Sequence, residues 1–146
     1  MDPLQTPVSK VIDAFLRKID DFKMLEYSDE DIDEDAKGYL TVAVANFEEI
    51  SGETLEIDAD GEYFTQELSN KIIDILALGM VVEWLKPIIY KADAMHNVMN
   101  LKDATFFSPA KIMEQKQMIY STATSEYNKA VINYTFNHGS MEDYVL

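Results

Sequence analysis

Five residues between Glu56 and Glu67 have the spacing of a calcium-binding loop. Glu56, Asp58, Asp60 and Glu67 stand where such a loop places ligands 1, 3, 5 and 12, and Gly61 stands at its sixth position. Carboxylate oxygens at this spacing can surround Ca²⁺, because the glycine lets the chain turn sharply between them. The pattern therefore makes a calcium module one alternative for this protein.

The surroundings of this loop argue against calcium. Its first position is Glu rather than Asp, and its eighth is the aromatic Tyr63 rather than an aliphatic residue. Gly52 would end the incoming helix too early, and the chain has no second loop to pair with the first. We therefore predict no bound metal here and keep cation binding by these carboxylates as an open alternative.

Other arrangements that carry chemistry are missing from the sequence. The chain has no cysteine, and its two histidines, His96 and His138, have no carboxylate or second histidine at ligand spacing. It also lacks a glycine-rich phosphate loop and a nucleophile-elbow serine. Many carboxylates are present, but no pair is singled out for acid–base work. We predict a protein that is not an enzyme and has no cofactor.

Negative charge is concentrated in the first half of the chain. The formal charge is −15, and residues 1–67 hold 19 Asp and Glu against 5 Lys and Arg, whereas residues 68–146 hold 8 against 7. Such a surface repels phosphates, so a protein that grips or reads nucleic acid is not expected. Three roles remain: a solvated face, a surface for basic proteins, or a wall past which DNA slides.

An acidic run at residues 29–35 is the densest part of this charge. It also suits a helix N-terminus, where carboxylates interact favourably with the helix dipole. As a candidate anionic channel face we take its acidic residues, Asp29, Glu30, Asp31, Asp33, Glu34 and Asp35.

The stretch 72–90 is the element that the others must surround. Only Asp74, Glu83 and Lys86 carry charge in it, and a helix apolar on nearly every side has to be buried by other helices. It is too short and too interrupted to be a membrane span, which needs about 20 apolar residues. Pro87 is expected to kink or end this helix within a turn, because it lacks a backbone donor.

Helical periodicity predicts a mainly α, four-helix bundle-like domain around this central helix. The predicted helices cover about 7–24, 31–50, 65–90 and 109–134, within one domain of 146 residues. Thr6-Pro7 and Ser108-Pro109 have the form of an N-cap followed by proline. Between the second and third helices we expect an acidic loop or short hairpin, and after the fourth a flexible tail, 137–146.

Aromatic and apolar residues on loops and ends are candidates for contacts with other molecules. Such groups either pack onto the chain's own core or anchor a neighbour. The methionines, scattered through apolar helices, are expected to fill gaps in the core. We take as candidate assembly residues Phe64, Phe106, Phe107, Phe136, Tyr144, Val145 and Leu146.

The order of these features resembles the head–tail connector, or neck, proteins of tailed bacteriophages. The segments that carry the resemblance are YLTVAVANF at 39–47, LGMVVEWLKP at 78–87 and NLKDATFFSP at 100–109. The resemblance implies a structural virion protein of the adaptor type, made in the host cytoplasm. Its subunits would form a homo-oligomeric ring, typically twelvefold, between the portal protein and a downstream neck or tail protein. DNA would pass through without specific binding.

A rival interpretation uses the same charge differently. An acidic inhibitor that mimics DNA would occupy the basic groove of a host nucleic-acid-binding protein, in a 1:1 complex that high salt dissociates. The mimic needs its carboxylates on one outer face, spaced like phosphates. The connector needs them facing a pore.

Overall fold

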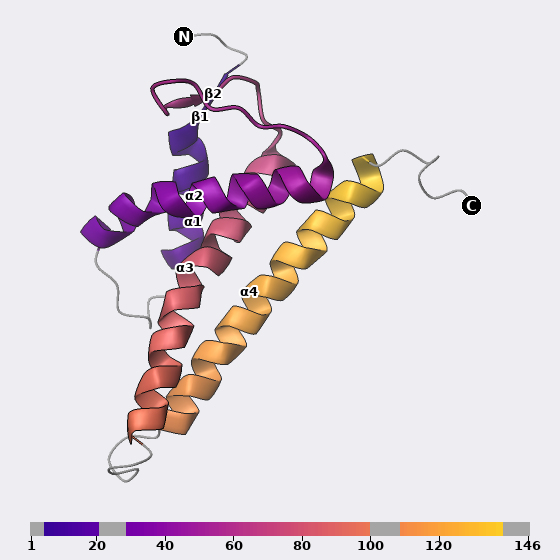
Figure 1. Ribbon diagram of the computed structural model, residues 1–146. Helices are drawn as coiled ribbons and strands as arrows, with labels where there is room; N and C mark the ends of the chain where they lie inside the picture. The colour runs from indigo at the N-terminus through magenta and orange to yellow at the C-terminus, as the bar shows by residue number, and fades with distance from the viewer. Residues whose placement is uncertain (1–4, 21–28, 100–108, 139–146) are drawn as a thin grey trace.

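Within residues 5–20, 29–99 and 109–138, which the computed structural model describes, the chain forms four helices and one two-stranded sheet. The mainly helical prediction is confirmed. α3 and α4 form a long antiparallel hairpin, α2 lies across its upper half, and α1 runs beside α3 (Figure 1). In order, the elements are β1 (Thr6–Pro7), α1 (Val8–Ile19), α2 (Asp29–Ser51), β2 (Tyr63–Phe64), α3 (Asn70–Met99) and α4 (Pro109–His138).

α3 is the central helix, as its sequence predicts. α1, α2 and α4 all pack against it, and Leu76, Met80 and Leu85 have no exposed surface. Each such side chain contributes roughly 1.5–3 kcal/mol through burial. From α1, the buried Phe15 makes an edge-on ring contact with Trp84 of α3, with centroids 6.4 Å apart, and another with Tyr39 of α2 at 6.0 Å. One aromatic ring thus joins three helices.

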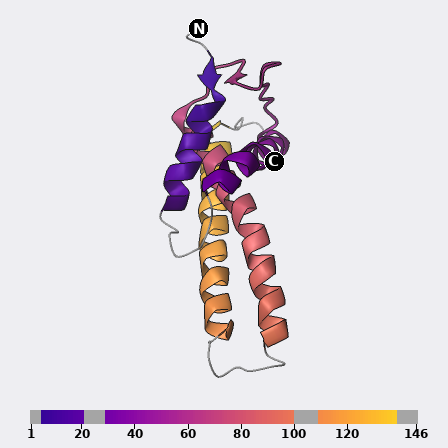
Figure 2. The ribbon, with the colours of Figure 1, turned by 90° about the vertical axis from the view of Figure 1, so that its left-hand side faces the viewer.

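The lower halves of α3 and α4 extend beyond α1 and α2 as a two-helix arm (Figures 1 and 2). α3 runs through Pro87 to Met99, so the prediction that proline ends the helix near residue 90 is wrong. Pro87 is exposed, whereas Trp84 and Leu85 just before it are buried. Packing on the inner side therefore keeps the helix continuous although one backbone hydrogen bond is lost.

Thr6 does not act as the helix N-cap that the sequence predicts. α1 is preceded by Pro7 without a side-chain cap, and the buried Thr6 hydroxyl accepts a hydrogen bond from the backbone N–H of Leu68 at 2.8 Å. Thr6–Pro7 pairs with Tyr63–Phe64, and the first N–H of α1, from Val8, donates to the Glu62 carbonyl at 2.8 Å. A partner far along the chain thus replaces the local cap, and α3 begins at residue 70 rather than 65.

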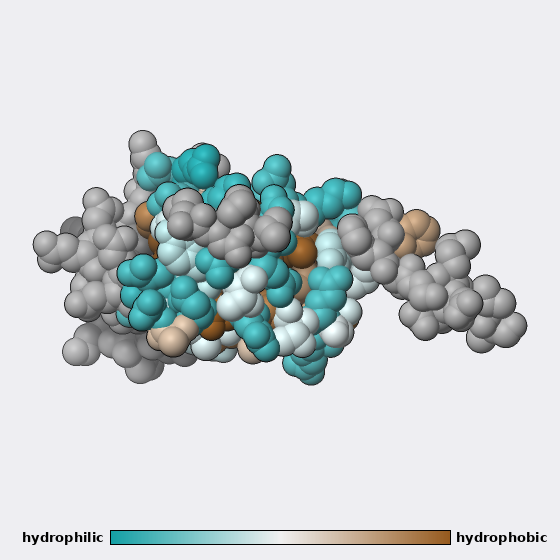
Figure 3. Space-filling model, turned by 90° about the horizontal axis from the view of Figure 1, so that it is seen from above, coloured by the Kyte–Doolittle hydropathy of each residue, from teal (hydrophilic) through white to brown (hydrophobic). Residues whose placement is uncertain are grey.

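The connection after α2 contains the short hairpin that the sequence predicts. α2 ends at Ser51, and the next residue, Gly52, has a φ of 75° that suits a residue without a side chain. An isolated antiparallel bridge joins Ile57 to Phe64, and the turn between them places Gly61 at φ 74°. The Asp58 carboxylate closes this turn by accepting from the backbone N–H of Glu62 at 2.9 Å. Seen from above, this end of the molecule is mostly hydrophilic, with small hydrophobic areas (Figure 3).

Candidate functional site

α4 has one buried face and one exposed face, and the exposed face carries three large apolar side chains. Ala123, Val131 and Tyr134 face the core and are 9% exposed or less. On the opposite side we define the outer α4 face by six exposed residues that recur every three, four or seven positions. They are Met118, Ser121, Ser125, Lys129, Ile132 and Phe136.

Three large apolar side chains project from the outer α4 face. Met118 is 66% exposed, Ile132 63% and Phe136 75%. Between them the helix carries hydroxyl groups, and a shallow depression of about 660 Å³ runs along it, lined in part by Ser125 and Lys129. The face thus has protruding apolar groups at both ends and small hydroxyl residues between them, and ridges of another helix can pack into such a depression.

The outer α4 face is also nearly free of negative charge. From 115 to 136 the only acidic residue is Glu126, against the two lysines Lys116 and Lys129. In a chain with a net charge of −15, this surface repels an acidic neighbour less than the acidic first half of the chain does.

Two contacts hold α4 in place and so orient this face. The Tyr134 hydroxyl donates to the carboxylate of Glu53, just after the end of α2, at 2.7–2.8 Å, and the Tyr134 ring lies 5.5 Å from that of Phe47. Burial and then the hydrogen bond to Glu53 raise the pKa of Tyr134 to about 12. The phenol is therefore neutral and a donor at ordinary pH.

The second contact is the crossing of α2, α3 and α4 at Gly79. A Cβ placed on Gly79 would lie 3.2 Å from the Cβ of Ala43 and 3.2 Å from a ring carbon of Tyr127. Burial, and second the charge of Glu83, raise the pKa of Tyr127. Its hydroxyl and that of Thr124 are buried without a hydrogen-bond partner among the described residues. The three helices thus cross at short distance, and two buried hydroxyls at the crossing lack a hydrogen-bond partner among the described residues.

One further pair on α3 lies beside α4. Lys86 donates to the Glu83 carboxylate at 2.7 Å, one turn apart, and this hydrogen bond raises the pKa of Lys86. The Glu83 side chain is only 16% exposed, so the lysine compensates a carboxylate that would otherwise be costly to bury.

The predicted assembly residues divide into three groups. Phe136 is exposed on the outer α4 face, as an interface contact requires. Phe64 is fully buried, because its pairing with Thr6 and with Ile57 turns it into the core, so the assembly prediction is wrong for this residue. The others lie outside the described residues: Phe106, Phe107, Tyr144, Val145 and Leu146.

The acidic run lies in the first two turns of α2, as its helix-start interpretation expects. The Asp35 side chain is exposed, which a channel-facing role requires. The side chains of the rest of the proposed face lie outside the described residues: Asp29, Glu30, Asp31, Asp33 and Glu34.

The calcium-like carboxylates do not form a cluster. The Asp58 carboxylate accepts a hydrogen bond within the turn, while Glu56, Asp60 and Glu67 are exposed. Across the described ranges no group of three or more His, Asp or Glu side chains could hold a metal ion.

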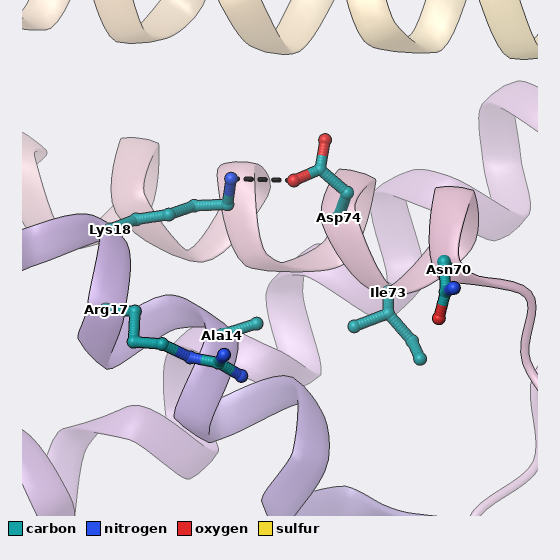
Figure 4. A pocket seen from close by; sticks show the side chains of 6 residues that line it. All are labelled: Ala14, Arg17, Lys18, Asn70, Ile73 and Asp74. Carbon is teal, nitrogen blue, oxygen red and sulfur yellow. Dashed lines mark ion pairs between the residues drawn. The ribbon is translucent and has the colours of Figure 1, made fainter.

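A small pocket between α1 and α3 is lined by charged residues, two of which form an ion pair with each other. Lys18 reaches Asp74 at 2.6 Å, while Arg17 folds back along α1 and its Nε donates to the Asp13 carbonyl at 3.4 Å (Figure 4). The carboxylate neutralises the lysine, and the guanidinium of Arg17 keeps its positive charge at the edge of the pocket.

Sequence reasoning missed the apolar character of the outer α4 face. Met118 was expected to fill a core gap, as the buried Met80 does, and Ile132 was assigned no role. The signal is present in the sequence: once 123, 131 and 134 are placed inward, positions 118, 132 and 136 must point outward.

None of the helices, as far as the structure describes them, is long and apolar enough to cross a membrane. Comparison of the chain with protein-family models, with curated proteins and with solved structures finds no match.

Proposed function

We propose that this chain is a structural subunit of the ring that joins the head of a tailed bacteriophage to its tail. The observation that carries the proposal is the outer α4 face, where Met118, Ile132 and Phe136 are each at least 63% exposed. Exposed large apolar groups along one helix face are a feature of interaction surfaces. A ring subunit needs such surfaces because it contacts a copy of itself on either side.

The charge distribution supports the same role. Residues 1–67 hold an excess of 14 acidic groups, 19 minus 5, and such a surface lets DNA pass without holding its phosphates. In this proposal the ring lies in the virion neck between the portal protein and a downstream neck or tail protein, and acts without a cofactor. Subunits are made in the host cytoplasm.

Electron microscopy of necks purified from virions tests the function. The proposal expects this chain as a ring of identical subunits bound to portal, with mass measurement giving its copy number. A chain that is absent from virions and never co-purifies with portal refutes it. A salt-sensitive 1:1 complex with a host DNA-binding protein would favour the DNA-mimic interpretation instead.

A further inference from the structure

α2 carries a second exposed stripe that complements the outer α4 face. We define the outer α2 face by five exposed residues at heptad-like spacing: Asp35, Gly38, Val42, Ala45 and Glu49. Its centre is small and apolar and its ends are acidic. The outer α4 face has the opposite character, with large apolar side chains and a central lysine.

Gly38 is the observation that singles out this stripe. It lies inside α2, where glycine is less favourable than alanine by about 0.5–1 kcal/mol. A Cβ on Gly38 would meet nothing within 4 Å, and its φ is not in the left-handed region. Nothing in the described chain therefore requires a glycine here. A helix from another molecule that approaches closely would.

The two faces are also comparable in length. From Asp35 to Glu49 the α2 stripe rises by 14 residue steps, or ~21 Å, and from Met118 to Phe136 the α4 stripe rises by 18 steps, or ~27 Å, at 1.5 Å per step. Both lie on outward sides of their helices, since Ala43 and Phe47 on α2 and Tyr134 on α4 face the core.

Building on the connector function, we propose that the outer α4 face of one copy docks on the outer α2 face of the next copy. Ile132 and Phe136 pack over the small residues Gly38 and Ala45, and Lys129 lies between the two acidic ends. The charges select this pairing, because acidic α2 stripes repel each other whereas the α4 stripe carries the opposite sign. Each copy uses two different surfaces, so the contact is heterologous and closes into a ring if its rotation allows.

Complementation between two single-face variants tests this pairing. One variant removes the α4 face with Ile132→Glu and Phe136→Glu, and the other removes the α2 face with Val42→Glu and Ala45→Glu. Each variant alone is expected to stay monomeric by light scattering, while wild type forms higher multimers as concentration rises. An equal mixture is expected to stop at a 1:1 dimer, because only one intact pair of faces remains.

Circular dichroism and urea unfolding would check that both variants are folded. Glu62→Lys, at an exposed position between α2 and β2, serves as a control that should assemble like wild type. Multimers formed by either variant alone, or a mixture that remains monomeric, would overturn the pairing. So would a wild-type protein that stays monomeric up to its solubility limit. The connector function is tested separately, on virions. Multimers that still form when these substitutions are present would therefore refute the pairing but not the connector function.

Discussion

Alanine substitutions at two helical glycines should have opposite effects on stability. Gly38 and Gly79 both lie inside helices without positive φ, so Ala at either site gains about 0.5–1 kcal/mol of helix preference. At Gly38 the new methyl meets nothing within 4 Å, and the gain is kept. At Gly79 it lies 3.2 Å from both Ala43 and Tyr127, and overpacking of this kind costs about 1–3 kcal/mol.

The expected magnitudes follow by subtraction. Gly38→Ala should raise the free energy of unfolding by about 0.5–1 kcal/mol. Gly79→Ala should lower it by about 0–2.5 kcal/mol, with about 1 kcal/mol as the central value. The crowding lies against Ala43, whose Cα is also only 3.8 Å from the added methyl, so the neighbour cannot rotate away as a flexible side chain would.

Urea unfolding followed by far-UV circular dichroism measures both changes, and an unchanged m-value shows that only stability has altered. Adding Gly79→Ala to an Ala43→Gly background should cost less than adding it to wild type, because one of the two clashing methyls is gone. If Gly79→Ala stabilises the protein as much as Gly38→Ala does, the close crossing of α2, α3 and α4 is refuted. Gly38→Ala should in addition weaken self-association, since it fills the space proposed for the next copy.

Four further substitutions probe three single contacts. Tyr134→Phe should destabilise by about 1–3 kcal/mol, because it removes a hydrogen bond to a charged carboxylate, and Glu53→Gln should cost less because an amide oxygen still accepts the bond. Since the folded pKa of Tyr134 is raised to about 12, its contribution is complete below pH 10 and is lost as pH rises to about 12, which urea unfolding at alkaline pH would show as a steeper fall in wild type than in Tyr134→Phe. Thr6→Val should cost about 1–3 kcal/mol in thermal or urea unfolding, since the buried N–H of Leu68 loses its acceptor; a neutral result would contradict that hydrogen bond. Asp74→Asn should change stability by less than about 1 kcal/mol, because its carboxylate is 53% exposed and its bond to the α1 lysine is screened; a larger loss would show a stronger pair than its exposure allows.

The parts of the fold that depend on local pattern were predictable from sequence. The 3.6-residue period places the helices, and the apolar run in α3 identifies the helix that the others cover. Gly52 and Gly61 mark the helix end and the turn because both positions need a left-handed backbone.

Features that depend on distant partners were not predictable. Thr6 has every local property of a helix cap, yet its hydroxyl accepts a hydrogen bond from the backbone N–H of Leu68, 62 positions later. Phe64 belongs to an acidic, exposed-looking segment, and only its pairing with β1 turns it inward. Pro87 should interrupt a helix, but burial of Trp84 and Leu85 outweighs the lost bond. In each case tertiary contacts override a local preference.

The candidate site was predictable in part. Phe136 follows from its place near the end of α4, and Asp35 from the acidic run. Gly38 and Val42, on the α2 face proposed to meet another copy, were not identified, because a period alone does not tell which exposed side of a helix is an interaction surface.

The position of α1 constrains how the protein folds during synthesis. Its apolar stripe is buried mainly against α3, with Phe15 on Trp84, a residue 69 positions later in the chain. At roughly 5–20 residues per second, the ribosome needs about 3 to 14 seconds to make that partner. Val11, Phe15 and Ile19, all buried in the finished fold, have no α3 to cover them during that interval. The first helix of this protein is thus covered only after the third has been made, and until then its apolar stripe is a natural target for chaperones.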